Sequence, residues 1–233
     1  LTRIAWSHIR TGTFEFAATL QNPDALSDLV NYTLARHYPE QTDAAMPALA
    51  LLNASAKRQG HLLALWMTSG FVHGVMNTDN MAISGESIDY GPCAFLDRYY
   101  NDCVFSSIDR SGRYAYGNQP RLAQWNLLRL AEALLTLPAL EHLSPQEVAD
   151  ECLENFQNAY ETEWLRIMRR KLGLYNSEPD DYALASRLFK EMENASADFH
   201  KTFVEIASSK LSELSLEPNT PFADWHQLWV QRI

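Results

Sequence analysis

Apolar residues recur at helical spacing over most of this 233-residue chain, and prolines separate the segments. In residues 24–38, between Pro23 and Pro39, one stripe carries Leu26, Leu29, Val30, Thr33 and Leu34. A period near 3.6 residues is typical of a helix with one buried face. Further helices are predicted over six ranges: 47–71, 121–137, 144–172, 180–194, 196–214 and 221–233. The expected fold class is therefore mainly α.

One region breaks the helical pattern. Residues 81–88 (MAISGESI) are short, have Gly85 at the centre and carry isoleucine near each end, so they predict a small β-hairpin. Residues 97–120 are polar, aromatic and rich in turn formers, which predicts a long ordered loop. No repeat, low-complexity tract or clear linker divides the sequence, and residues 1–233 are expected to form a single domain.

Composition and charge exclude several classes of partner. The formal net charge is −10, which argues against a nucleic-acid partner, because a polyanion needs a basic face. ATP stays compatible with this charge, since it brings Mg²⁺ and needs only a local positive cluster. No apolar run is long enough to span a membrane, and the N-terminus has no signal-peptide pattern. Three widely spaced cysteines suggest neither zinc nor a disulfide framework, and a cytoplasmic setting is expected.

The stretch HGVMNTDNMAISGESIDYG, residues 73–91, resembles the catalytic segment of protein kinases. Kinases carry His-Arg-Asp-x-x-x-x-Asn followed by Asp-Phe-Gly. Here His73 stands seven residues before Asn80, and Asp89 opens an Asp-Tyr-Gly triplet. The position of the kinase catalytic Asp holds Val75. The stretch therefore reads either as an inactive kinase site or as a site that uses another residue.

The predicted hairpin would place Asn80 and Asp89 at its open end. An amide oxygen and a carboxylate there are suited to hold one Mg²⁺ against a nucleotide. Asp79 is the nearest group that could accept a proton where Val75 cannot. His73, beside a glycine at the end of an apolar helix, is expected to be structural. The alternative is that Asp79 and Asn80 are turn residues and Asp89 merely ends a strand.

Arg3 and Arg10 form a second constellation near the N-terminus, in TRIAWSHIR. On a helix, this spacing would put both guanidinium groups on one face, where they would clamp phosphate oxygens. The alternative is two ordinary surface arginines. Five tryptophans on helical stripes are expected in the core: Trp66, Trp125, Trp164, Trp225 and Trp229. A basic run is expected to form a solvated helix face: Arg166, Arg169, Arg170 and Lys171.

Three motifs in order resemble the selenoprotein O family: TRIAWSHIRTGTFE, HGVMNTDNMAISGESIDYGPCAFLD and GRYAYGNQPRLAQWNLLRLAEALL. Weaker similarity continues through MRRKLGL and DFHKTFVEIA to DWHQLWVQRI, so it covers essentially the whole chain. The resemblance implies a protein-kinase-like fold. It also implies a protein adenylyltransferase, which binds ATP in an orientation flipped relative to kinases and transfers AMP to Ser, Thr or Tyr hydroxyls of other proteins.

The same resemblance implies the role of each candidate residue. Asp79 becomes the acceptor of the hydroxyl proton. Asn80 and Asp89 become the ligands of Mg²⁺, with Mn²⁺ as an alternative, and Asp89 also lies close to the nucleotide. Arg3 and Arg10 become phosphate-binding arginines. The implied partners are ATP and protein substrates with hydroxyl side chains.

Two parts of the family pattern are missing from this sequence. Family members have an N-terminal lobe, with a glycine-containing loop, a Lys and an acidic partner, and a C-terminal tail with a redox-active Cys or selenocysteine. The chain is therefore expected to be the kinase-like C-lobe alone, with little or no activity by itself. Two rival functions remain open: a kinase-like phosphotransferase, and a non-catalytic pseudokinase interaction module.

Overall fold

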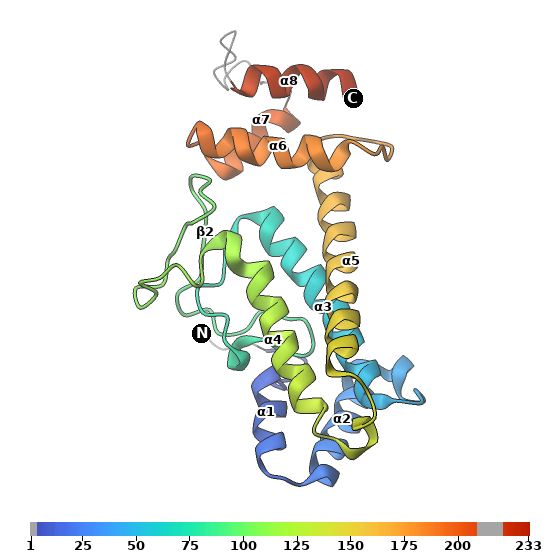
Figure 1. The fold of residues 1–233 in the computed structure, drawn as a ribbon. Helices are drawn as coiled ribbons and strands as arrows, with labels where there is room; N and C mark the ends of the chain where they lie inside the picture. The colour runs from blue at the N-terminus through green and yellow to red at the C-terminus, as the bar shows by residue number, and fades with distance from the viewer. Residues whose placement is uncertain (1–3, 209–220) are drawn as a thin grey trace. The chain divides into compact units, whose positions relative to one another are not determined.

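The predicted segments fold as helices in the computed structural model, which describes residues 4–208 and 221–233 (Figure 1). The helices are α1 (Thr11–Thr19), α2 (Pro23–His37), α3 (Pro47–Ser69), α4 (Gln119–Leu134), α5 (Pro145–Lys171), α6 (Asp181–Asn194), α7 (Phe199–Ala207) and α8 (Pro221–Arg232). Strands β1 (Phe71–Val72) and β2 (Ala94–Phe95) pair antiparallel, with Phe71 opposite Phe95. The expectation of a mainly α fold is confirmed; the kinase-like C-lobe stays a prediction.

Helix α2 shows why proline punctuation predicts helix ends well. Pro23 occupies the first helical position, where its missing N–H costs no hydrogen bond, and the side chain of Asn22 accepts from Ala25 N at 3.3 Å. The predicted stripe is buried except at Leu29, which is half-buried. The helix ends one residue before the predicted limit, at His37.

The largest departures from the predicted helices concern α1 and α7. Helix α1 was not predicted, because TGTFEFAAT is short and rich in residues that favour strands. Its low helix propensity is offset by tertiary contacts with α2 and α4, which stabilise the helix. Helix α7 begins at Phe199 rather than residue 196, because the Asp198 side chain accepts from Lys201 N at 2.7 Å. The predicted continuation over 209–214 lies outside the described residues.

Two expectations about side-chain burial are wrong in part. Trp125 is 37% exposed and lies beside Arg129, whereas the other four tryptophans are buried as predicted. The basic run at the end of α5 is not wholly solvated. Lys171 donates to the Thr68 carbonyl at 2.5 Å and lies 4.1 Å from the centre of the Phe203 ring, and burial lowers its pKa.

The described residues divide into two compact units, with boundaries inside α3 and α5. The first unit holds residues 4–63, 75–91 and 119–161, and in it α1 packs against α4 and α2. The second holds residues 64–74, 92–118, 162–208 and 221–233, and in it α6 packs against α8. The predicted ordered loop 97–120 carries an isolated bridge from Arg98 to Asp198 and a short 3₁₀ turn (Tyr116–Asn118) before α4 begins. The single-domain expectation stays a prediction.

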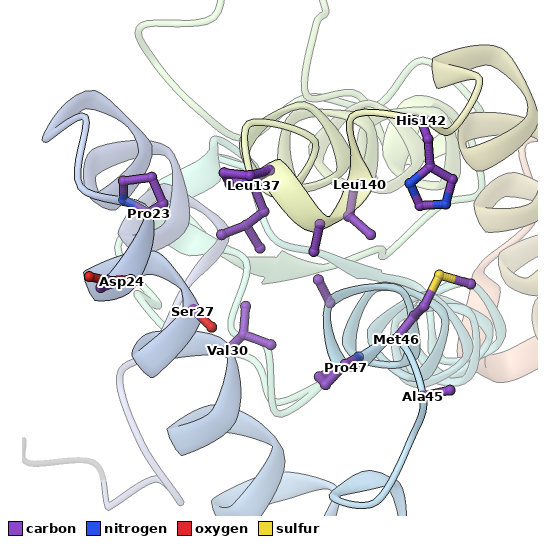
Figure 2. A pocket seen from close by; sticks show the side chains of 13 residues that line it. Pro23, Asp24, Ser27, Val30, Ala45, Met46, Pro47, Leu137, Leu140 and His142 are labelled. Carbon is purple, nitrogen blue, oxygen red and sulfur yellow. The ribbon is translucent and has the colours of Figure 1, made fainter.

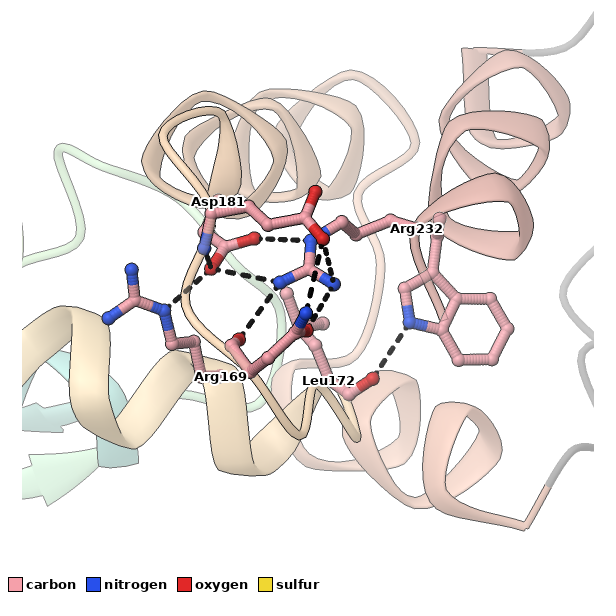
Figure 3. A network of polar contacts seen from close by, with 7 residues as sticks. Arg169, Leu172, Asp181 and Arg232 are labelled. Atoms are coloured by element: carbon pink, nitrogen blue, oxygen red, sulfur yellow. Dashed lines mark hydrogen bonds and ion pairs between the residues drawn. The ribbon is translucent and has the colours of Figure 1, made fainter.

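The second unit contains a polar network centred on Asp181 (Figure 3). This residue is fully buried at the start of α6. Its carboxylate accepts from Arg169 Nε at 2.6 Å, from Arg232 Nε at 2.6 Å and from Glu178 N at 2.9 Å. Burial alone would raise the pKa of Asp181, but these hydrogen bonds outweigh it and lower the pKa to about 2. The network ties the ends of α5 and α8 to α6.

No helix in the described ranges 4–208 and 221–233 is long and apolar enough to cross a membrane.

Candidate functional site

The predicted hairpin forms, but with a single bridge in place of two paired strands. Met81 and Ser87 make a single antiparallel bridge, and Gly85 takes a left-handed conformation (φ 73°) in the turn between them. The turn is tight, with Gly85 N donating to the Ala82 carbonyl at 3.1 Å. Residues on either side of the bridge therefore leave the hairpin at the same open end, as predicted.

The extended residues just before α1, Ile9 and Arg10, pair with the hairpin. Arg10 bridges antiparallel to Ala82, with Ile83 N donating to the Ile9 carbonyl at 2.9 Å and Thr11 N to the Met81 carbonyl at 3.0 Å. Helix α1 starts directly after this segment. The pairing brings the N-terminal motif and the hairpin motif into one site.

Arg10 lies beside Asp79 as a result. Its Nη1 donates to the Asp79 carbonyl at 3.2 Å and lies 3.7 Å from the carboxylate Oδ1. The Arg10 side chain is 39% exposed and that of Asp79 is 65% exposed, so the pair is open to solvent. In the part of the chain that the structure describes, Arg10 Nε is buried and has no hydrogen-bond partner.

The helical argument for Arg3 and Arg10 is wrong. Residues 4–9 are not helical, and Arg10 is extended (φ −124°, ψ 165°) just before α1. The extended form is required because the backbone of residues 9–11 pairs with the hairpin. Arg10 reaches the site through this pairing, and Arg3 lies outside the described residues.

Asn80 and Asp89 flank the hairpin in different environments. Asn80 is buried at the end of a 3₁₀ turn (Thr78–Asn80), and its Nδ2 donates to the Val75 carbonyl at 2.9 Å. Asp89 is exposed and has a left-handed backbone (φ 57°), a conformation that few residues other than glycine adopt. Asp adopts this conformation more often than most residues, and Gln21 and Ser196 adopt it outside the site, so the backbone alone assigns Asp89 no role.

The donor set of this site fits Mg²⁺ by its chemistry. The predicted ligands Asn80 and Asp89 offer oxygen atoms, which hard cations prefer. Across residues 4–208 and 221–233, no group of three His, Cys, Asp or Glu side chains is placed to hold a metal ion. One or two protein ligands, with the rest from phosphate and water, are usual for Mg²⁺.

Several polar side chains that hold the hairpin were missed at the sequence level. Gln59 Nε2 donates to the Ala82 carbonyl at 2.7 Å, and the Tyr38 hydroxyl donates to the Ile83 carbonyl at 2.6 Å. Asn126 Nδ2 donates to the Met76 carbonyl at 3.0 Å, in the loop before the hairpin. A polar residue within a buried helical stripe, as at positions 59 and 126, is the signal that would have found them, because buried polar groups need partners.

His73 occupies the buried, structural position expected for it. Its ring is fully buried in the second unit and stacks on Trp66, with ring centres 5.3 Å apart. It also meets the edge of Phe71 at 6.3 Å.

The first unit also holds an apolar pocket of about 360 Å³, shown in Figure 2. The residues that line it come from the start of α2, the start of α3 and the turn after α4, and include Val30, Met46 and Leu140. None of the predicted site residues lines this pocket. It is separate from the hairpin site.

Comparisons with known proteins agree with the family resemblance of the sequence. The family model described as "Protein adenylyltransferase SelO" matches residues 1–231. The chain is 49% identical over 234 residues to a protein of Halalkalibacterium halodurans named "Protein nucleotidyltransferase YdiU". Proteins of the same name from Clostridium beijerinckii and Bacillus mycoides are 47% and 46% identical over 233 residues. Each match covers 100% of this chain but 48% of the relative, so the chain spans about half the length of these relatives.

Proposed function

The chain belongs to the family described as protein adenylyltransferase SelO, and from this premise we propose that the full-length protein transfers AMP from ATP to Ser, Thr or Tyr hydroxyls of other proteins. The residues assigned to the reaction are Asp79, Asn80, Asp89 and Arg10, with Arg3 added by family resemblance alone.

The observation that carries the proposal is the pairing of Arg10 with the hairpin. It sets a guanidinium group beside Asp79, and the buried Nε of Arg10 has no partner among the described residues. Buried donors are nearly always satisfied, so an unsatisfied one next to an open carboxylate supports an oxygen-rich ligand at this site, although Arg129 Nε is also unsatisfied away from it. A phosphate group has such oxygens, and Arg is well suited to bind it.

In the proposed reaction, a substrate hydroxyl oxygen attacks the α-phosphorus of ATP. A new P–O bond forms to the substrate, the bond from the α-phosphorus to the bridging oxygen breaks, and pyrophosphate leaves with the electron pair. Asp79, exposed at the surface of the site, accepts the hydroxyl proton. Arg10 offsets negative charge that builds on the phosphate oxygens.

Asn80 and Asp89 would hold the Mg²⁺ ion, which would supply further neutralisation of phosphate charge. Asn80 is suited to a fixed position because its amide nitrogen is committed to the Val75 carbonyl. The left-handed backbone of Asp89 turns the chain directly after the hairpin. These residues form the oxygen-donor part of the site, and Asp79 acts as the proton acceptor.

The test is label transfer from ATP by the full-length protein in the presence of Mg²⁺. ATP labelled at the α-phosphate is expected to label protein substrate, whereas ATP labelled at the γ-phosphate is expected to leave it unlabelled. Label from the γ-phosphate alone would replace the proposal with the kinase-like phosphotransferase. The 233-residue chain, assayed in parallel, is expected to transfer little, because it covers only 48% of its relatives.

A non-catalytic interaction module makes a different prediction in the same assay. It predicts no label from either phosphate, and no loss of function in cells when Asp79, Asn80 and Asp89 are replaced by alanine. Transfer of α-label that depends on Asp79 would exclude it.

A further inference from the structure

Gly12 lies in the first turn of α1, where its backbone does not require glycine. Five other glycines have a conformational reason, a left-handed backbone; Gly74 and Gly85, for example, have φ of 87° and 73°. Gly12 is helical, and glycine is an unfavourable residue inside a helix. The close approach of another residue to position 12 explains why glycine is present there.

The space that a side chain at position 12 would fill is taken by Asp79. A Cβ atom built on Gly12 would lie 2.7 Å from Asp79 Oδ1, 3.4 Å from Asp79 Cγ and 3.4 Å from the Thr78 carbonyl oxygen. The first of these distances is well inside van der Waals contact. Any residue other than glycine at position 12 would therefore meet the Asp79 carboxylate in its present position.

We propose that Gly12 is a positioning residue for Asp79: the missing side chain lets the carboxylate lie against the first turn of α1, within 3.7 Å of Arg10 Nη1. The inference rests on the proposed function in one respect, that Asp79 acts as proton acceptor. The contact between Gly12 and Asp79 is independent of that role.

A methyl group at position 12 would displace the carboxylate rather than the helix. The Asp79 side chain is short and 65% exposed, so it rotates away at little cost. The helix backbone is fixed by the bond from Thr11 N to the Met81 carbonyl and by a reciprocal pair between Arg10 and Thr13. Alanine also favours the helix over glycine. Gly12→Ala should thus keep or raise the melting temperature while it moves the carboxylate.

The experiment compares full-length wild type with Gly12→Ala in α-label transfer. The expected result is a kcat lower by about 10- to 100-fold, because a displacement near 1 Å at a reacting group has an effect of this order. The KM for ATP should stay within about twofold, since Arg10 and the metal ligands are unchanged. Thr19→Ala, at the exposed end of the same helix, is the matched control: it also favours helix and should leave kcat unchanged.

A double-mutant cycle tests that Gly12 acts through Asp79. In an Asp79→Ala background, Gly12→Ala should change the residual transfer by less than about twofold, because the displaced group is already gone. An undiminished kcat in Gly12→Ala, or an equal loss in both backgrounds, would overturn the inference and leave the proposed function standing.

A crystal structure of Gly12→Ala separates the two proposals if wild type transfers no AMP. The Asp79 carboxylate should then occupy a different rotamer, beyond reach of Arg10, whatever the reaction. A carboxylate found unmoved would overturn the positioning role of Gly12. A moved carboxylate in an inactive protein would support that role while the adenylyltransferase proposal fails.

Discussion

Two arginine–aspartate arrangements in this protein contrast in almost every physical respect. At Asp181, a fully buried carboxylate is bonded by Arg169 and Arg232 at 2.6 Å and by a backbone N–H. At Asp79, a carboxylate that is 65% exposed has one arginine at 3.7 Å. Arg10 also keeps a buried Nε with no partner among the described residues.

The difference separates a stabilising network from a candidate site. The oxygens of the Asp181 carboxylate accept hydrogen bonds from within the protein, so few acceptor positions remain for a ligand. Among the described residues, the Asp79 pair leaves hydrogen-bonding capacity unused on both partners, and an exposed pair at this distance contributes little to stability. Residues kept in such an arrangement are better explained by a ligand than by folding.

The largest effect is expected at Asp79. Asp79→Asn in the full-length protein removes the proton acceptor and should lower AMP transfer by about 10²- to 10⁴-fold. The free energy of unfolding should change by less than about 0.5 kcal/mol, because the pair is exposed. Label transfer and urea unfolding measure the two quantities. Asp28→Asn, an exposed aspartate on α2, is the control and should alter neither.

At Asp181, substitution should change the free energy of unfolding much more than substitution at Asp79 does. Asp181→Ala leaves two arginines without their shared partner and should lower the free energy of unfolding by about 3 kcal/mol, near the low end for a broken buried pair because Arg169 is partly exposed. Tryptophan fluorescence during urea unfolding reports this, since Trp225 and Trp229 lie in the same unit. Asp224→Ala breaks only an exposed contact with Arg187 at 3.9 Å and should cost little.

Acid should weaken the Asp181 network in a defined range. The folded-state pKa is lowered to about 2 from an ordinary value of 3.8, so the network's contribution is complete above pH 3.8 and is lost as the pH falls towards 2. The urea midpoints of wild type and Asp181→Asn should therefore differ most near neutral pH and converge in that range. A difference that stays constant from pH 6 to about 2 would show that the charge of Asp181 does not matter.

Arg10→Lys is expected to have as small an effect on stability as Asp79→Asn. It removes the forked donor group but keeps the charge, and should change the free energy of unfolding by less than about 0.5 kcal/mol. Transfer of α-label should fall, because an ammonium group cannot reproduce the guanidinium geometry at phosphate oxygens. A loss of stability comparable to that of Asp181→Ala would remove the contrast between the two arrangements.

The local sequence pattern was sufficient to predict most helices and the candidate residues that flank the hairpin. Prolines and apolar periodicity placed α2 within one residue at each end, because both features act within a turn or two of helix. The oxygen donors Asp79, Asn80 and Asp89 were recognisable from residue type and spacing around a short turn. Their metal-binding and catalytic roles stay predictions.

Predictions from the local sequence pattern were wrong where contacts with distant segments decide the local conformation. Residues 4–9 were considered as a helix, yet Arg10 is extended because the neighbouring backbone pairs with the hairpin. The basic run at the end of α5 looked like a solvated face. Lys171 instead reaches the Thr68 carbonyl, 103 residues away, and Arg169 reaches the buried Asp181.

The amino-acid order alone was enough for the mainly helical class, the short hairpin and the chemistry of its flanking oxygens, because these depend on neighbours within a few residues. Tertiary structure decided which of these groups meet. Arg10 reaches the Asp79 carbonyl across 69 residues, and Gly12 makes room for the Asp79 carboxylate. Contacts of this kind arise only when packing and backbone pairing bring distant segments together, and no local period encodes them.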